Sequence, residues 1–229
     1  MLRVAVAGAL GRMGRVASSA LREASGVTYV GGLARKCADD DVVLTLDELF
    51  ERKPDVLLDL TTHPSSVVIS MQALAHGVRP VIGVSGWNEN EISALDADAR
   101  DRGIGAMVVP NFSIGALLMM QFAQTAAKFF PSVEIVELHH DKKIDAPSGT
   151  SRLTAKRISD GGGPSSVPIH SVRMRGLLAH QEVLFGSEGE LLTIRHDSFS
   201  RESFVPGMLA AVKAVMDVRG VAIGLPIDD

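Results

Sequence analysis

The segment 137–150 concentrates side chains that give or accept protons. It reads Glu-Leu-His-His-Asp-Lys-Lys-Ile-Asp-Ala-Pro-Ser-Gly-Thr. Imidazole and ammonium groups serve as general acids and bases, so His139 and Lys143 are the candidate proton-transfer residues. The residues before them, Val133–Leu138, are rich in β-branched and apolar side chains, which predicts a strand. Because successive strand residues point to opposite faces, His139 and His140 are expected to do different work.

The end of the same segment predicts a binding site for an anion. Asp145–Pro147 reads as a turn, and Ser148 after it is a natural N-cap for a helix. The amides of Gly149 and Thr150 would then lie in the first helical turn, where helix termini bind carboxylates. Taken singly, a histidine at a strand end is commonly structural, and a lysine is commonly solvated. Their concentration in one strand, turn and helix favours an acid–base site beside a carboxylate cradle.

The composition is that of an ordinary globular protein. The chain has 229 residues, 46% of them hydrophobic, and a formal net charge of −4, enough for one large domain or two modest ones. Nothing in its charge predicts binding to nucleic acid or to a membrane surface, and no apolar run approaches the ~20 residues of a membrane helix. The single cysteine, Cys37, excludes an internal disulfide framework. We expect a cytoplasmic protein with no signal peptide and no metal site.

The start of the chain has the order of elements that a dinucleotide site requires. Leu2–Ala7 is a nearly continuous apolar run, typical of a buried parallel strand, and a helix pattern covers Arg15–Ala24. Between them, glycines at positions 8, 11 and 14 form a G-x-x-G-x-x-G spacing. Such glycines would let the backbone approach a pyrophosphate at the helix N-terminus. The commoner spacing is G-x-G-x-x-G, and a tight turn without a ligand is the alternative interpretation.

The residues after the second strand indicate which cofactor is preferred. Val27–Leu33 is predicted as that strand, and sites selective for NAD usually place Asp or Glu near its end to bind the ribose 2′-hydroxyl. Here Ala34 takes that place, followed by Arg35 and Lys36, which suit a 2′-phosphate. We therefore predict NADPH as the preferred cofactor and NADH as an alternative one. Solvated surface charge is the other interpretation of the two cations. Cys37 has no neighbouring base, and no catalytic role is predicted for it.

Alternating strands and helices continue as far as residue 113. The predicted strands and helices are Asp47–Arg52 (helix), Asp55–Leu60 (strand), Ser65–His76 (helix), Arg79–Val84 (strand), Glu89–Arg102 (helix) and Gly105–Val109 (strand). Asn88 is the expected N-cap of the third of these helices, with Glu91 reinforcing its first turn. This alternation predicts a doubly wound parallel sheet of the α/β class, whose ligands bind at the carboxyl ends of the strands.

The pattern changes in the second half, which predicts a second domain of the α+β class. Its predicted elements are the helix Ile114–Phe130, the strand 133–140, the helix from Ser148 to Ser159, and the strands Ile169–Met174, His180–Phe185 and Leu191–His196. The last three strands are joined without helices, which indicates an open mixed sheet with a face to bury, and hence a homo-oligomer. A last helix, Pro206–Val218, is expected to return to the first domain. The predicted domains are residues 1–112 with 206–229, and residues 113–205.

These motifs together resemble the dihydrodipicolinate reductase family of bacterial lysine and diaminopimelate biosynthesis. The resemblance rests first on the segment 137–150 and on the glycine turn from Gly8 to Gly14. Further matching pieces follow in family order and cover nearly the whole chain: Gly83–Gly86, Pro110–Ser113, Ser171–Arg173, Ala179–Glu182, Phe185–Gly186 and Ile194–His196. In that family, many members carry an acidic residue where this chain has Ala34.

The resemblance implies a fold, an assembly and a set of site residues. The implied fold is an N-terminal Rossmann domain with a C-terminal domain whose open mixed sheet builds a homotetramer. His139 matches the family's proton donor and acceptor, Lys143 its proton donor, and His140, Gly149 and Thr150 its substrate ligands. The cofactor residues implied by the family, together with Lys36 from the charge pattern, are Gly8, Ala9, Leu10, Gly11, Arg12, Met13, Arg35, Lys36, Gly83, Val84, Ser85, Val109, Pro110, Asn111 and Phe112.

The reaction of the family agrees with the chemistry of these residues. Its substrate is a cyclic imine with two carboxylates, dihydrodipicolinate, which is in equilibrium with its hydrate, 4-hydroxy-tetrahydrodipicolinate. Hydride transfer to the conjugated ring leaves an enamine that needs a proton at carbon, and tetrahydrodipicolinate is the product. His139 and Lys143 are the expected sources of that proton. The amides of Gly149 and Thr150 would hold a carboxylate.

Two other functions are compatible with parts of the sequence. A related NAD(P)-dependent dehydrogenase of another amino or imino acid would share the fold, because specificity depends on few contacts. A catalytically silent, cofactor-binding regulator would keep the glycine turn but would have no need of His139 or Lys143. The presence of both residues favours the reductase.

Overall fold

The chain folds into two compact units. The computed structural model describes residues 1–36 and 40–226, so Cys37 lies outside the described residues. One unit comprises Met1–Phe112 with Phe204–Asp229, and the other comprises Ser113–Ser203. Each unit has its own sheet, and each is described by itself below.

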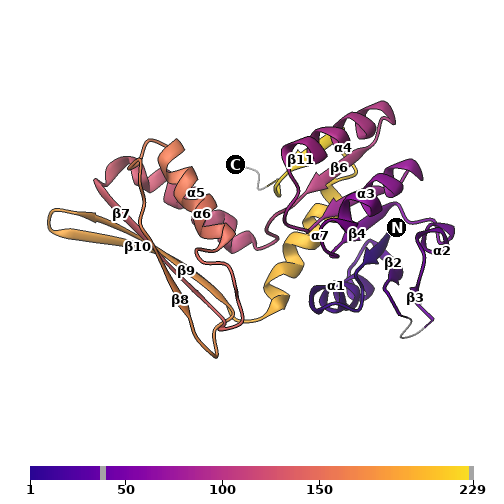
Figure 1. The fold of residues 1–229 in the computed structure, drawn as a ribbon, viewed down its shortest axis with the longest axis horizontal. Helices are drawn as coiled ribbons and strands as arrows, with labels where there is room; N and C mark the ends of the chain where they lie inside the picture. The colour runs from indigo at the N-terminus through magenta and orange to yellow at the C-terminus, as the bar shows by residue number, and fades with distance from the viewer. Residues whose placement is uncertain (37–39, 227–229) are drawn as a thin grey trace. The chain divides into compact units, whose positions relative to one another are not determined.

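The first unit is built on a seven-stranded parallel sheet, in the order β11-β6-β5-β4-β1-β2-β3 (Figure 1). Its strands are β1 (Leu2–Ala7), β2 (Val27–Leu33), β3 (Val42–Val43), β4 (Val56–Asp59), β5 (Arg79–Ile82), β6 (Gly105–Val108) and β11 (Gly220–Ile223). Every pair in the sheet is parallel, which confirms the predicted doubly wound α/β architecture. The strand order reverses beside β1, between β2 on one side and β4 on the other. Ligands of such sheets bind at that point.

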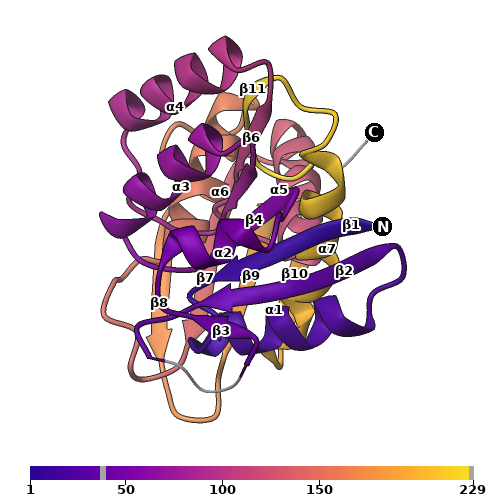
Figure 2. The same cartoon turned by 90° about the vertical axis from the view of Figure 1, so that its right-hand side faces the viewer.

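Helices cover both faces of this sheet (Figure 2). They are α1 (Arg12–Glu23), α2 (Leu46–Glu51), α3 (Ser65–Ala75), α4 (Glu89–Asp101) and α7 (Val205–Ala214). Helices α1 and α7 pack on one face, and α2, α3 and α4 pack on the other. A strand covered on both faces is apolar at most positions, which is why β1 reads as an apolar run apart from Arg3.

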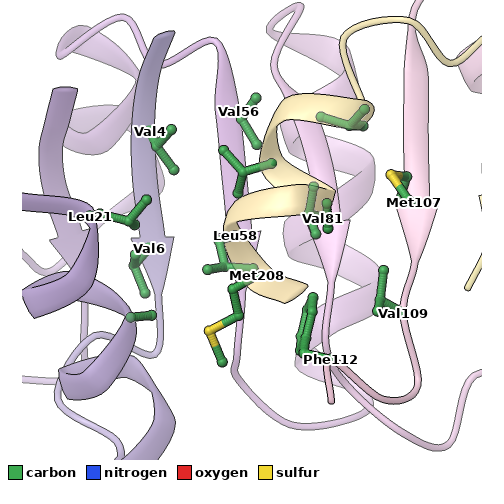
Figure 3. Close-up of a cluster of buried hydrophobic side chains, with 14 of the residues drawn as sticks. Val4, Val6, Leu21, Val56, Leu58, Val81, Met107, Val109, Phe112 and Met208 are labelled. Atoms are coloured by element: carbon green, nitrogen blue, oxygen red, sulfur yellow. The ribbon is translucent and has the colours of Figure 1, made fainter. Parts of the chain in front are cut away.

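The core between β1, α1 and α7 fixes the helix that follows the glycine turn. Val4 and Val6 of β1 point into it, and Leu21 of α1 and Met208 of α7 pack from the opposite side (Figure 3). All four side chains are buried. Burial of each such side chain contributes about 1.5–3 kcal/mol, so the position of α1 relative to β1 is strongly determined.

The structure differs from the sequence predictions mainly at element ends. Helix α1 begins at Arg12 rather than Arg15, because Gly11 is its N-cap, and so Arg12 and Met13 lie in its first turn. Strands β3 and β11 were not predicted; both lie at the edges of the sheet and are short. Helix α7 ends at Ala214, before the predicted Val218. The predicted cap of α4 is confirmed as a capping box.

The second unit is a four-stranded mixed sheet with two helices. Its elements are α5 (Ile114–Ala126), η1 (Ala127–Phe129), β7 (Ser132–His139), α6 (Gly149–Asp160), β8 (Ile169–Arg173), β9 (Ala179–Ser187) and β10 (Glu190–Ser198), and the turn η2 (Arg201–Phe204) leads out of it. The sheet order is β10-β9-β7-β8, with β7 and β8 parallel and the other pairs antiparallel. The predicted open mixed sheet is therefore confirmed.

The two faces of this second sheet differ in character. The face toward α5 and α6 buries alternate residues such as Ile135 of β7 and Val183 of β9. The opposite face carries Glu134, His170 and Leu191, which are exposed. Period-two alternation of this kind is expected when only one face of a sheet is packed.

Candidate functional site

The turn after β1 has the geometry of a nucleotide-phosphate cradle. Gly8 has a φ of +79°, and a Cβ placed on it would lie 2.7 Å from the carbonyl oxygen of Leu60. A Cβ on Gly14 would fall on the carbonyl oxygen of Gly8. Gly11 caps α1 without a side chain, so the positive end of the helix dipole is left for a ligand. The three glycines thus supply the tight turn, the open helix terminus and the close helix packing that a dinucleotide site needs.

The other predicted cofactor segments lie at carboxyl ends of strands in the same sheet. Arg35 and Lys36 follow β2 and are exposed. Gly83 follows β5, and a Cβ on it would lie 2.8 Å from Leu60 and would meet the ring of Phe112, so these segments touch. The segment from Val109 to Phe112 follows β6. Adjacent parallel strands therefore bring the predicted segments to one edge of the sheet.

Not all of these residues present a side chain to that edge. The side chains of Ala9, Val84, Val109 and Phe112 are buried in the hydrophobic core. A ligand would meet these residues through their backbone, while Leu10, Arg12, Met13, Ser85, Pro110 and Asn111 are at least partly exposed. The buried residues therefore support the backbone at this edge, and the partly exposed residues present their side chains to it.

A buried carboxylate that the sequence did not single out braces the same edge. Asp59, at the end of β4, is fully buried and accepts hydrogen bonds from the Thr61 amide (2.9 Å), the Thr61 hydroxyl (2.6 Å) and the Ser66 hydroxyl (2.5 Å). The Trp87 indole N–H donates in turn to the Ser66 oxygen at 3.1 Å. Because the carboxylate has these donors, its burial is compensated, and it fixes the turn that contacts Gly8.

In the second unit, His139, the predicted acid–base residue, is bonded to a buried glutamate. Glu137 and His139 are two residues apart on β7 and so share a face, and His139 Nδ1 contacts Glu137 Oε2. Arg173 of β8 reaches the same carboxylate through two nitrogens, at 2.8 Å and 2.6 Å. Arg173 is also the register partner of His139 across the parallel pair. The result is a His139–Glu137–Arg173 network in which the carboxylate is fully buried.

Lys143 lies in the turn after β7 and is tied to the same network. Its ammonium contacts both carboxylate oxygens of Asp145, at 2.7 Å and 2.9 Å. Arg173 donates to the backbone carbonyl of Asp145 at 2.8 Å, and the Lys143 amide donates to the carbonyl of His140 at 3.1 Å. The predicted proton-transfer residues, His139 and Lys143, are thus connected through Arg173 and the turn.

The helix terminus that the sequence predicts as an anion cradle is the start of α6. Ser148 is the N-cap, as predicted, and its hydroxyl accepts from the Ser151 amide at 3.1 Å. The first helical residues are Gly149 and Thr150, whose amides belong to the turn that lacks intrahelical acceptors. Among the described residues, nothing lies within 4 Å of a Cβ placed on Gly149. The cradle therefore opens onto free space.

The first turn of α6 is anchored to the sheet through a polar chain. Gln181 of β9, which is buried, donates to the Thr154 hydroxyl at 2.8 Å, and Thr154 donates to the carbonyl of Thr150 at 2.9 Å. Buried hydrogen bonds of this kind restrict the helix to one position. Gln181 was noted in the sequence only as part of the family resemblance.

The electrostatics of the network follow from burial and from its cations. Burial alone would raise the pKa of Glu137, but hydrogen bonds from Arg173, Ser171 and His139 outweigh it and hold that pKa at about 2. Burial lowers the pKa of His139, the Glu137 carboxylate raises it, and the charges of Lys143 and Arg173 lower it again. The balance leaves the pKa of His139 below its ordinary value, so the imidazole is mainly neutral near pH 7.

His140 is separate from this network. It is the first residue after β7, and its Nδ1 is buried and has no hydrogen-bond partner within the described part of the chain. A buried nitrogen without a partner is costly, and a ligand that satisfies it would offset that cost.

The sequence reasoning gave no role to Glu137 or Arg173. The spacing of Glu137 and His139 at i and i+2 on a predicted strand was the available signal for the first, because it places both on one face. No local signal existed for the second, because Arg173 reaches the site through strand pairing 36 residues away.

Residues 1–36 and 40–226 contain no group of three or more His, Cys, Asp or Glu arranged to hold a metal ion. In the same ranges, no helix is both long and apolar enough to cross a membrane.

Comparison with known proteins places the whole chain in one family. Residues 2–112 match the model of the dihydrodipicolinate reductase N-terminus, and residues 115–224 match that of the C-terminus. The chain is 44% identical to the 4-hydroxy-tetrahydrodipicolinate reductase of Halalkalibacterium halodurans, with 98% of each chain covered. It is 42% identical to the enzyme of that name from Bacillus pumilus, with 98% of this chain and 96% of the relative covered. The first alignment has 259 positions, more than the 229 residues of this chain, so the relative carries segments that this chain lacks.

Solved structures of similar fold support the same family assignment. A dipicolinate-bound dihydrodipicolinate reductase from Paenisporosarcina sp. TG-14 superimposes with a TM-score of 0.88 at 39% identity, covering 98% of both chains. A probable dehydrogenase from Thermotoga maritima, at 11% identity and a TM-score of 0.70 over 97% of this chain and 91% of its own, shares the fold alone. The matches cover both units, and the chain belongs to the dihydrodipicolinate reductase family.

Proposed function

We propose that this chain reduces dihydrodipicolinate, formed by dehydration of 4-hydroxy-tetrahydrodipicolinate, to tetrahydrodipicolinate in lysine and diaminopimelate biosynthesis. The observation that carries the proposal is the arrangement in the second unit. A neutral imidazole, an ammonium group and an open helix terminus come from one strand, turn and helix, in a chain of this family. A regulator without catalysis would have no use for this set.

The cradle at the start of α6 binds one carboxylate of the substrate. The amides of Gly149 and Thr150 and the positive end of the α6 dipole are suited to an anion, and the space around Gly149 leaves room for one. The buried Nδ1 of His140 gives a second polar contact for the ligand. The relative from Paenisporosarcina binds dipicolinate, a ring with two carboxylates, which supports this choice of ligand.

Lys143 and His139 are the candidate donors of the one proton that the substrate takes up after hydride transfer. Once the ring has accepted a hydride, its enamine carbon takes a proton, and the Lys143 ammonium held by Asp145 supplies it. His139 has Nδ1 bonded to Glu137, so its Nε2 is the nitrogen that would give this same single proton in place of Lys143. The Asp145 carboxylate orients the Lys143 ammonium.

The first unit is suited to a nicotinamide dinucleotide, which supplies the hydride when bound. The glycine turn and the open N-terminus of α1 would hold the pyrophosphate, and the segments after β5 and β6 would border the nicotinamide. The exposed Arg35 and Lys36 after β2 suit a 2′-phosphate, so we propose NADPH as the preferred cofactor, with NADH as the weaker one. A reduced cofactor and a single cysteine both favour the cytoplasm.

We also propose that the protein assembles as a homotetramer through the exposed face of the second sheet. That face carries Leu191 of β10, which is 68% exposed, and the His170–Glu134 ion pair of β8 and β7. A mixed apolar and charged sheet face suits a symmetric contact between copies. Sedimentation of the purified protein is expected to give four times the chain mass, and a stable single chain would contradict the assembly.

The activity is tested by following oxidation of NADPH, with NADH in parallel. The substrate is generated freshly from pyruvate and aspartate semialdehyde by the preceding condensation, and the product is identified by mass. We expect rapid, substrate-dependent oxidation with a higher kcat/KM for NADPH than for NADH. Tight NADPH binding without any oxidation would overturn the reductase assignment. Equal or better use of NADH would overturn only the cofactor preference.

A further inference from the structure

We infer that Glu137 and Arg173 are positioning residues, which together fix the orientation of His139 and the place of the substrate-binding helix terminus. The inference rests on the proposed function, because His139 and the start of α6 are its acid–base group and its carboxylate cradle. Neither Glu137 nor Arg173 needs to touch the substrate. Their effect is transmitted through the groups that they hold.

One buried carboxylate is the common acceptor of donors from three elements. Glu137 accepts from His139 on its own strand β7, from Arg173 on β8 at 2.6 Å and 2.8 Å, and from the backbone amide of Ser148 at the start of α6, at 3.2 Å. The contact with Ser148 ties the N-cap of α6 to the same oxygen, Oε1, that Arg173 Nη2 holds. A shift of Glu137 would therefore move the histidine and the cradle together.

A purely structural ion pair would not need this arrangement. A bidentate Arg173–Glu137 pair already offsets much of the cost of burying both charges, although Arg173 Nε has no hydrogen-bond partner among the described residues. In addition, Glu137 Oε2 accepts a hydrogen bond from Nδ1 of His139, the only imidazole in the network. The Arg173 guanidinium also donates to the Asp145 carbonyl, in the turn that carries Lys143. The same two residues thus reach each of the groups that the proposed reaction uses.

The bond to Nδ1 determines which nitrogen of His139 meets the substrate. With a carboxylate as acceptor, Nδ1 keeps its hydrogen, and in the neutral ring Nε2 then carries the free lone pair. When the imidazole of His139 is protonated, the proton that it can give to the substrate is the one on Nε2. The Nε2–H bond then breaks, the enamine carbon of the substrate gains the proton, and the imidazole returns to its neutral Nδ1–H tautomer. Without the carboxylate, the hydrogen is free to move to Nε2, which would leave no lone pair facing the substrate.

The charged groups around His139 set the direction of the expected titration. Glu137 on β7 stabilises the protonated ring, and Arg173 on β8 and Lys143 in the following turn destabilise it. Asp145, the remaining charge in the turn, is paired with Lys143. Replacing Glu137 with a neutral residue removes the stabilising charge and leaves the cations, so the pKa of His139 must fall.

The test uses Glu137→Gln, which keeps the size of the side chain but removes its charge. Asp160→Asn is the matched control, because it makes the same carboxylate-to-amide change in the same unit, at the exposed Lys156 pair near the end of α6. The measurements are ¹⁵N NMR of His139, the kcat and KM for substrate and for NADPH, and the pH dependence of kcat.

For Glu137→Gln we expect three changes. The His139 titration and the matching inflection in the kcat profile move to lower pH, the Nδ1–H tautomer loses its dominance, and kcat falls at least about 10-fold. The KM for NADPH stays the same, and Asp160→Asn behaves as the unmodified protein. A purely structural role would lower stability without moving the tautomer or the pH inflection, and that result would overturn the inference.

Two controls keep the inference separate from folding and from the proposed reaction. If Glu137→Gln does not fold, NMR of the unmodified protein still decides: a dominant Nε2–H tautomer of neutral His139 would refute the role of Glu137. If the unmodified protein binds NADPH but reduces no dihydrodipicolinate, the proposed function fails. If it does reduce the substrate and Glu137→Gln retains its kcat and pH profile, only the inference fails.

Discussion

At the scale of single residues, most of the charged groups of the candidate site have hydrogen-bond or ion-pair partners. Glu137 is satisfied by donors from three elements, and Lys143 by both oxygens of Asp145. Within the site, His140 Nδ1 and Arg173 Nε are the buried nitrogens without a partner among the described residues, and the space at Gly149 is open. A ligand with a carboxylate and a further polar group would fill the space at Gly149 and give His140 Nδ1 a hydrogen-bond partner.

Gly149→Ala tests the cradle directly. A Cβ at this position meets no described atom within 4 Å, and alanine is a better helix former than glycine, so the fold and the melting temperature should be retained. If a substrate carboxylate lies against the Gly149 amide, the added methyl group takes up its space. We expect the KM for dihydrodipicolinate to rise at least about 10-fold, equivalent to about 1.4 kcal/mol. The KM for NADPH is the internal control, and an unchanged substrate KM would argue against the cradle.

At the scale of elements, the candidate site in each unit is a strand followed by a turn and a helix N-terminus. In the first unit the order is β1, the glycine turn and α1; in the second it is β7, the Lys143 turn and α6. Both helix termini point positive partial charge at the expected anion, a pyrophosphate in one case and a carboxylate in the other. The difference lies in how the turn is fixed, by glycine packing in the first and by the Glu137 network in the second.

Gly14→Ala and Gly11→Ala form a matched pair that separates packing from binding. The methyl group added at position 14 would fall on backbone atoms of Gly8 and Ala9, which cannot move aside without distorting the turn. We therefore expect Gly14→Ala to lower the free energy of unfolding by about 1–3 kcal/mol and to abolish NADPH binding. The methyl group added at position 11 would lie 3.1 Å from the Gly8 oxygen, a tighter contact than usual but a single one. Gly11→Ala should therefore keep most of the stability, and it should weaken NADPH binding if the pyrophosphate binds at this turn, as proposed.

Thermal unfolding and NADPH titration of both variants measure these two effects. Equal loss of stability in the two variants would contradict the separate roles of the glycines. Retained NADPH affinity in Gly11→Ala, with the fold intact, would contradict a pyrophosphate at this turn.

The elements with strong periodic signals were predictable, and the contacts between them were not. Strand β2, the capping box of α4 and the Ser148 cap were read correctly because each signal is local. Strand β3 has two residues and β11 has four, too short to give an apolar pattern of their own. The Arg173–Glu137 contact depends on the register of β7 with β8, which no stretch of sequence displays.

At the scale of the whole molecule, the buried network links the site to folding stability. The pKa of Glu137 is about 2 in the folded chain, against an ordinary value of 4.5. A carboxyl group with a lowered pKa stabilises the fold fully above about pH 4.5, and the contribution is lost as the pH falls toward 2, because the unfolded chain binds the proton more tightly. The difference corresponds to about 3 kcal/mol as an upper value.

Urea unfolding between pH 6 and pH 3 checks this contribution. We expect the unmodified protein to lose stability below about pH 4.5 more steeply than Glu137→Gln, so that the difference between the two narrows with acid. Other carboxylates with lowered pKa values, such as Asp145, titrate in both proteins and cancel in the comparison. A constant difference across the range would show that Glu137 does not carry the effect.

The most direct test of the central claim, that the segment after β7 carries the chemistry, is the turnover of Lys143→Ala. Lys156→Ala is the control, because it also removes a lysine paired with an aspartate, but from the exposed side of α6. If Lys143 supplies the proton, kcat for dihydrodipicolinate should fall at least about 100-fold, with NADPH affinity and melting temperature retained and Lys156→Ala unaffected. Turnover of Lys143→Ala within twofold of the unmodified protein would contradict the account.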